Sequence, residues 1–142
     1  MISPSEIEIL AKTIYGEARG EYPRKQGGLP SLIAVGNVVM NRVNTEGRFG
    51  NDIRSVCLKP FQFSCWNEGD CNRLLLDHDK LKNDGIYRVC IQVAKHLSSG
   101  GWPDLTNGSN HYHAYHIRPK WAHTHDLRAK IGRHWFYKLG AA

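Results

Sequence analysis

The chain has 142 residues, of which 41% are hydrophobic and 23% charged, as in an ordinary single globular domain. No apolar run approaches the length of a membrane span, and residues 1–6 lack the basic and apolar regions of a signal peptide. We therefore expect synthesis in the cytoplasm and no membrane insertion. The formal net charge of +6 favours an anionic partner, although basic surfaces without one are common, and its even spread argues against a nucleic-acid-binding tail.

The first predicted helix begins after Ser3, a favoured N-cap residue, and ends near Glu17 or Arg19. Four apolar residues recur at helical spacing and predict one buried stripe, namely Ile7, Leu10, Ala11 and Ile14. Glu17 lies three residues beyond the last of them and so continues the stripe. The sequence therefore places a carboxylate where a hydrophobic residue is expected.

A glutamate that points toward the core is costly unless it is paired, hydrogen-bonded or neutral. Partial burial raises the pKa of a carboxyl group toward the range in which it donates a proton near neutral pH. We therefore take Glu17 as the first candidate for catalysis, flanked by Gly16 and Gly20, which would let a polymer approach the backbone. The alternative is that Glu17 lies in solvent or pairs with Arg19.

Glycine and proline residues that interrupt helices occur from Gly20 to Pro30 and predict a loop. A second helix, very apolar and therefore central, is expected from about Ser31 to Val43. Residues 44–84 have the composition of irregular structure, with a possible short helix at 73–82. A third helix should follow the Asn83-Asp84 cap and end at residues 98–101. Two short aromatic segments, 111–117 and 134–137, could pair as strands.

The four cysteines have no zinc-knuckle or thioredoxin spacing. Cys65 and Cys71 bracket a short loop and could form a disulfide in an oxidising compartment. Free thiols are expected for Cys57 and Cys90, and Cys90 lies on an apolar helix face.

Four sequence blocks occur in one order along the chain: residues 14–21 (IYGEARGE), 34–43 (AVGNVVMNRV), 61–66 (FQFSCW) and 111–137, from HYHA through PKWA to IGRHWFY. Together they resemble the cell-wall hydrolase family typified by the spore-cortex-lytic enzyme SleB. The resemblance implies an α+β, mainly α, lysozyme-like fold over residues 1–142, with a small antiparallel sheet near the cleft. It also implies that the protein cleaves the glycan strand of peptidoglycan without a cofactor, with Glu17 as the family's catalytic glutamate. Asn110-His111 departs from the small residue and threonine that often stand there in the family.

Cleavage of a β-1,4 glycosidic bond requires a proton on the leaving oxygen, and hydrolysis normally needs a second carboxylate. Glu21 is four residues beyond Glu17, but Gly20 makes their helical alignment unreliable, and Asp104 and Asp126 are distant in sequence. A lytic transglycosylase avoids this requirement, because the same glutamate then takes the proton of the muramic acid C6 hydroxyl as a 1,6-anhydro ring closes. The resemblance favours this route, with a hydrolytic muramidase as the alternative.

Other residues are expected to bind the sugar or support the site. Arg19 would orient Glu17 or contact a muramic acid carboxylate, unless it forms a structural ion pair with Glu21. Aromatic rings stack on sugar faces and amides hold hydroxyl groups. The expected sugar-subsite residues are Tyr15, Gln62, Phe63, Tyr112 and Trp121, although Phe63 and Trp121 fit the core equally well, and the expected supporting residues are Glu21, His134 and Tyr137.

Two rival functions remain at this point. His111 and His113 would point the same way on a strand, as ligands of a zinc amidase or peptidase do, but no H-E-x-x-H spacing occurs, so we expect no metal. A basic module that only binds wall polymer or nucleic acid would explain the charge but not Glu17. We expect a monomeric phage endolysin that acts on peptidoglycan strands and not on nucleic acid, released from the cytoplasm into the periplasm or wall. A bacterial wall enzyme is the alternative origin.

Overall fold

The computed structural model describes residues 2–60, 62–70, 73–76 and 78–140. Its larger helices are α1 (Pro4–Ala18), α2 (Gly28–Val43) and α5 (Gly85–Ser98), with shorter helices α3 (Ile53–Leu58) and α4 (His78–Leu81). Three 3-10 helices lie between these helices, namely η1 (Arg19–Glu21), η2 (Ser64–Trp66) and η3 (Arg73–Leu76), and a further one, η4 (Lys120–Thr124), lies after α5 between two strands. Within the described residues, no helix is long and apolar enough to cross a membrane.

The sheet has three antiparallel strands in the order β1 (His111–Ala114), β3 (His134–Tyr137) and β2 (Leu127–Ile131). The β1–β3 register pairs Tyr112 with Phe136 and Ala114 with His134. Side chains alternate between the two faces of a strand, so Tyr112, His134 and Phe136 share one face. That face packs on α2, where Phe136 meets Ala34 and Val38.

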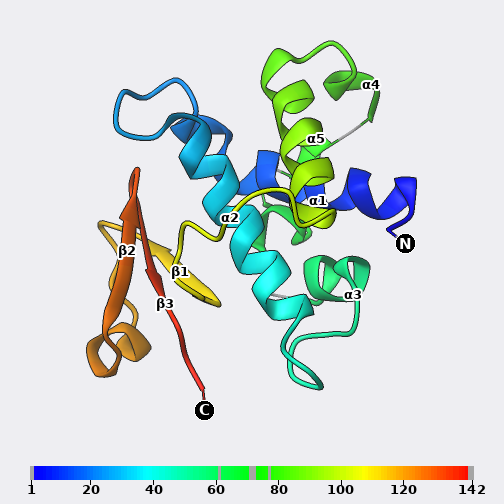
Figure 1. Ribbon diagram of the computed structural model, residues 1–142. Coiled ribbons are helices and arrows are strands. Elements are labelled where there is room, and N and C mark those ends of the chain that lie inside the picture. Colours follow the sequence, from blue (N-terminus) through cyan, green and yellow to red (C-terminus); the bar gives the residue numbers. More distant parts are fainter. Residues whose placement is uncertain (1, 61, 71–72, 77, 141–142) are drawn as a thin grey trace.

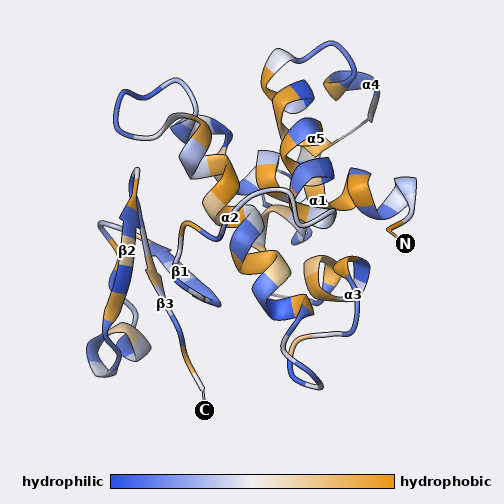
Figure 2. Ribbon diagram, in the orientation of Figure 1, coloured by the Kyte–Doolittle hydropathy of each residue, from blue (hydrophilic) through white to orange (hydrophobic). Residues whose placement is uncertain are grey.

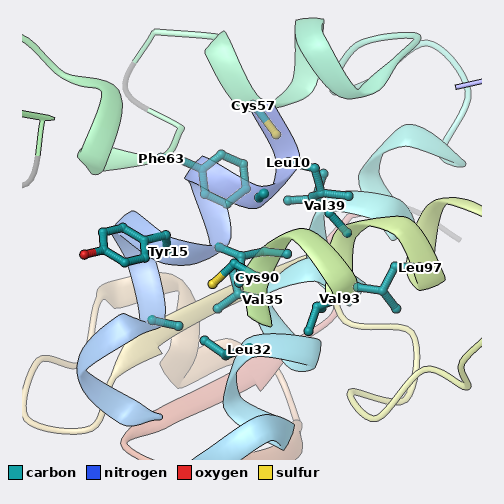
Figure 3. Close-up of a cluster of buried hydrophobic side chains, with 14 of the residues drawn as sticks. Leu10, Tyr15, Leu32, Val35, Val39, Cys57, Phe63, Cys90, Val93 and Leu97 are labelled. Carbon is teal, nitrogen blue, oxygen red and sulfur yellow. The ribbon is translucent and has the colours of Figure 1, made fainter. Parts of the chain in front are cut away.

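Helix α2 lies between the sheet and the other helices (Figure 1). Opposite its sheet-facing side, Leu32, Val35 and Val39 enter the main core with residues of α1 and α5 (Figure 3). Gly36 allows this close packing, because a Cβ there would lie 2.2 Å from a methyl carbon of Leu97. Burial on both sides explains why the sequence of this helix is so apolar (Figure 2).

The first helix agrees closely with its prediction, since the Ser3 hydroxyl accepts a hydrogen bond from the Glu6 backbone N–H and the helix ends at Ala18. The second begins at Gly28, earlier than predicted, because Pro30 is tolerated in a first helical turn. The prediction of irregular structure was wrong for α3, which starts with a capping box between Asp52 and Ser55.

Strand β2 was also missed. Its side chains are mostly exposed or half-buried, so the segment lacks the clear alternation that marks a strand with one buried face. The predicted first strand is shorter than expected and ends at Ala114, after which the chain turns.

Candidate active site

Glu17 lies in the last turn of α1 and is half-buried. Its Oε2 atom accepts a hydrogen bond of 3.1 Å from the backbone N–H of Cys65 in η2, and the Ser64 hydroxyl lies 3.5 Å from the same oxygen. Its Oε1 atom accepts a hydrogen bond from the Tyr112 hydroxyl of β1. Three segments that are far apart in sequence therefore converge on one carboxylate.

Gly16 makes the contact between α1 and η2 possible. A Cβ at this position would lie 2.5 Å from Cβ of Cys65, closer than side chains approach one another. The absence of a side chain at Gly16 thus lets the Cys65 backbone reach Glu17. The space beside this glycine is filled by the protein itself and is not left for a polymer on that side.

Tyr112 presents its hydroxyl to Glu17 from the sheet face that packs on α2. Its ring contacts Phe136 and His134, with centroid distances of 5.5 and 4.9 Å. Burial, followed by the charge of Glu17 and the hydrogen bond to it, raises the pKa of Tyr112 well above its usual value. The hydroxyl therefore keeps its proton and acts as a donor to Glu17.

A pocket of about 350 Å³ opens beside Glu17. One wall comes from the end of α1 and from η1, and the other from the end of β1 and the turn between β2 and β3. The residues that line it are Gly16, Glu17, Ala18, Arg19, Gly20, Glu21, Ala114, His116, Arg133 and His134. The expected acid thus faces a concavity that can receive a substrate.

Glu21, the second carboxylate of this pocket, is tied to Arg133 and is 4% exposed. Its Oε1 accepts a hydrogen bond of 2.6 Å from the Arg133 backbone N–H, and its Oε2 accepts one of 2.7 Å from Nε of the same arginine. A terminal guanidinium nitrogen lies 2.6 Å from Oε2. Gly132 fits this contact, because a Cβ there would lie 2.6 Å from Oε1 of Glu21. The pair joins the two walls of the pocket.

The Glu21–Arg133 contact makes a pH-dependent contribution to stability. Burial by itself raises the pKa of the Glu21 carboxyl, but the hydrogen bonds and charge of Arg133 outweigh burial, so this pKa lies below its ordinary value of 4.5. A lowered pKa in the folded state stabilises the protein above pH 4.5, and the contribution is lost as the pH falls through the folded-state pKa.

We therefore expect Glu21→Gln to lower the free energy of unfolding at neutral pH by about 1–3 kcal/mol, since a charged acceptor is lost. The difference from the wild type should shrink as the pH falls below 4.5. Urea unfolding from pH 7 down to acid measures it, with the exposed Glu46→Gln as the matched control. A difference that stays constant with pH would contradict this role of the Glu21 carboxylate.

Buried Arg42 of α2 holds two segments near the site. Its Nε donates a hydrogen bond of 2.8 Å to the carbonyl oxygen of Asn110, just before β1, and a terminal nitrogen donates one of 3.3 Å to the Gln62 side chain. Its guanidinium lies 5.0 Å from the ring centroids of both Phe49 and Phe63. Arg42 thus positions Gln62, which is exposed, and the start of the strand that carries Tyr112.

Three predicted sugar-subsite residues, Tyr15, Phe63 and Trp121, and the predicted supporting residue Tyr137 are not among the residues that line the pocket. Tyr15 is buried, and its hydroxyl donates a hydrogen bond of 2.8 Å to Asp84, the N-cap of α5. Burial and Asp84 raise its pKa to about 12. Phe63 and Tyr137 are each 1% exposed, so their rings have no free face on which a sugar could stack. Trp121 is half-buried and packs edge-on against Tyr137 with centroids 5.4 Å apart. Tyr15, Phe63 and Tyr137 act in packing, because the protein encloses their rings, whereas Trp121 keeps part of its surface exposed.

The structure brings other predicted residues together. Glu17, Arg19, Glu21 and His134 line one pocket, and Tyr112 contacts Glu17. The Arg19 guanidinium also lies 5.5 Å from the centroid of the Tyr15 ring. Sequence reasoning missed the Cys65 backbone N–H, since a main-chain donor leaves no trace in residue type. It also missed Arg133, although this residue stands beside His134 in the last sequence block.

The two histidines of β1, His111 and His113, bond to other groups of the protein. Both ring nitrogens of His113 have partners, the Ala114 carbonyl oxygen at 2.7 Å and the Tyr137 hydroxyl at 3.1 Å. Nδ1 of His111 lies 2.7 Å from the side-chain oxygen of Asn110. Across the described part of the chain, no three His, Cys, Asp or Glu side chains are grouped to hold a metal ion.

Three cysteines are buried free thiols, namely Cys57, Cys65 and Cys90. Burial raises the pKa of Cys57 and Cys90 to about 12, so both thiols stay protonated. The expected partner of Cys65 in a disulfide, Cys71, lies outside the described residues.

Comparison with known proteins decides the family. The model of the family described as Cell Wall Hydrolase matches residues 29–137, more than half of the chain. The chain belongs to the cell wall hydrolase family. Its sequence is 28% identical over 139 residues to the spore cortex-lytic enzyme of Bacillus cereus. The aligned region covers 96% of this chain and 45% of that protein. The chain thus spans less than half the length of this relative.

Solved structures of this cell wall hydrolase family share the fold. The catalytic domain of the Bacillus cereus SleB protein has a TM-score of 0.67 and 25% identity, covering 97% of this chain and 93% of that one. The catalytic domain of the germination-specific lytic transglycosylase SleB from Bacillus anthracis has a TM-score of 0.66 and 26% identity, covering 96% and 97%. The predicted family and the mainly helical fold with a small antiparallel sheet are confirmed.

Proposed function

We propose that this cell wall hydrolase cleaves the glycan strand of peptidoglycan as a lytic transglycosylase, with Glu17 as its catalytic residue. The observation that carries the proposal is the Glu17 carboxylate, which lies at a pocket and is held by donors from η2 and β1. The match to the catalytic domain of a germination-specific lytic transglycosylase supports the same reaction.

In the first step, protonated Glu17 donates its proton to the glycosidic oxygen as the bond from C1 of muramic acid to that oxygen breaks. Tyr112 and the Cys65 N–H stabilise the carboxylate that forms, because both donate to its oxygens.

In the second step, the C6 hydroxyl of the same muramic acid attacks C1, and the Glu17 carboxylate takes the hydroxyl proton. The 1,6-anhydro ring closes, and Glu17 returns to its protonated form. No water is consumed and no second carboxylate is required. The pocket suits a reaction with one catalytic carboxylate, because the other carboxylate that lines it, Glu21, is bound to Arg133.

Two residues are candidates for substrate binding, and only the first of them lies in the pocket beside Glu17. Arg19 lines it and can contact an anionic group of the substrate, such as the muramic acid carboxylate. Gln62 is exposed, with its amide oxygen directed to Arg42, which leaves its amide nitrogen available to a sugar oxygen. A basic chain with a net charge of +6 also suits an anionic wall polymer.

We infer that the protein acts where peptidoglycan lies, in the wall or periplasm, and we propose that it does so as a monomeric phage endolysin. The family match supports the place of action. Light scattering of the purified protein tests the oligomeric state, and a dimer at assay concentration would contradict the monomer.

Mass spectrometry of digested peptidoglycan tests the proposed reaction. We expect muropeptides that end in 1,6-anhydro-muramic acid. Reducing muramic acid ends would instead assign a muramidase, and free stem peptides an amidase. Binding of wall without any cleavage would assign a binding module.

A further inference from the structure

His134 lies at the wall of the pocket with its two ring nitrogens in different surroundings. Nδ1 is buried, and among the described residues no group forms a hydrogen bond with it. Nε2 is not among the buried unpaired atoms, no hydrogen bond to it occurs within the described residues, and the residue lines the pocket beside Glu17. Nε2 is therefore the nitrogen that a bound substrate can reach.

The strand register explains this orientation. His134 pairs directly with Ala114, which also lines the pocket, and the small alanine side chain leaves the outer edge of the imidazole open. On its other side the imidazole packs against the tilted Tyr112 ring at a centroid distance of 4.9 Å. It also packs edge-on against the Phe136 ring at a centroid distance of 6.3 Å. Packing thus fixes the ring while one nitrogen stays free.

The imidazole is neutral in this setting. Burial is the largest influence and lowers the pKa of His134 below 6.5; Arg133 and His113 lower it as well, and only the nearby Glu21 carboxylate raises it. A neutral imidazole carries one proton, and an unpaired N–H in the interior is rarer than an unpaired lone pair. We therefore assign the proton to Nε2, where it points to the pocket.

We propose that His134 is a substrate-binding residue whose Nε2–H donates a hydrogen bond to an uncharged oxygen of the glycan, a hydroxyl or an acetamide carbonyl, next to the bond that Glu17 cleaves. This inference rests on the proposed function. A neutral donor suits a sugar oxygen, whereas the cationic Arg19 of the same pocket suits a carboxylate.

Two variants separate hydrogen bonding from packing. The side-chain amide of His134→Gln can place a donor near the position of Nε2, whereas His134→Phe keeps the ring packing on Tyr112 but has no donor. We expect His134→Phe to lower kcat/KM on soluble glycan-strand fragments about 3- to 10-fold, mainly through KM, which corresponds to one neutral hydrogen bond. His134→Gln should stay within about twofold of the wild type. The exposed His123→Gln is the matched control.

Melting curves of both variants complete the test. His134→Phe removes an unpaired buried nitrogen and should melt no earlier than the wild type, so a loss of activity then reflects the lost donor. Wild-type kcat/KM in His134→Phe, or an equal loss in both folded variants, would overturn the inference. If His134→Phe fails to fold, the nitrogen resonances of the intact His134 imidazole are measured in the Glu17→Gln protein instead. The Nε2 resonance should shift when an uncleavable glycan fragment binds. An unchanged resonance would overturn the proposal. Wild-type protein that cleaves no glycan would instead refute the proposed function itself.

Discussion

Glu17→Gln is expected to lower the rate of peptidoglycan cleavage by about three orders of magnitude or more, because one side chain supplies both the proton donor and the proton acceptor. The amide can keep the local contacts, with its oxygen accepting from the Cys65 N–H and its nitrogen facing the Tyr112 oxygen. Folding should therefore be preserved. The release of soluble muropeptides per unit time measures the effect.

Glu46→Gln serves as the matched control, since Glu46 is exposed in the loop between α2 and α3. It should cleave at the wild-type rate. Circular dichroism and melting curves of Glu17→Gln should overlay those of the wild type. Wild-type cleavage by a folded Glu17→Gln protein would remove Glu17 from the mechanism.

Tyr112→Phe is expected to have the second-largest effect. The substitution removes the hydroxyl that donates to Oε1 of Glu17 and keeps the ring that packs on His134 and Phe136. A hydrogen bond to a charged group contributes about 1.5–3 kcal/mol, which corresponds to a loss of about 10- to 100-fold in kcat/KM. Initial rates on soluble glycan fragments measure this loss.

Tyr115→Phe is the control for this variant, because Tyr115 follows β1 and is 54% exposed. It should leave kcat/KM unchanged. A Tyr112→Phe protein that folds and cleaves at the wild-type rate would show that the hydroxyl does not support Glu17 during catalysis.

The position of Glu17 could be predicted from sequence because a helix has a fixed period. Ile14 and Glu17 are three residues apart, so a buried Ile14 places Glu17 at the edge of the same stripe. The partners of Glu17 could not be derived in this way. Cys65 and Tyr112 reach it from η2 and β1, and their approach depends on how the chain packs after residue 44.

Aromatic residues were the least predictable part of the site. Residue type alone cannot distinguish a ring that stacks on a sugar from one that fills the core. Phe63 packs beneath Arg42, and Trp121 packs on the sheet face away from α2. The partner of Glu21 could not be predicted either. This partner, Arg133, follows a glycine with a positive φ of 58° in the turn between β2 and β3. The sequence does not show which element that turn will face.

The account depends most directly on Glu17 acting alone, first as acid and then as base, so that water never enters the reaction. Digestion of peptidoglycan in water enriched in heavy oxygen, followed by mass spectrometry of the muropeptides, tests this claim. We predict new 1,6-anhydro-muramic acid ends that carry no heavy oxygen, and none in the Glu17→Gln protein. New reducing ends that carry the heavy isotope would contradict the account, because they require a water molecule to attack the sugar.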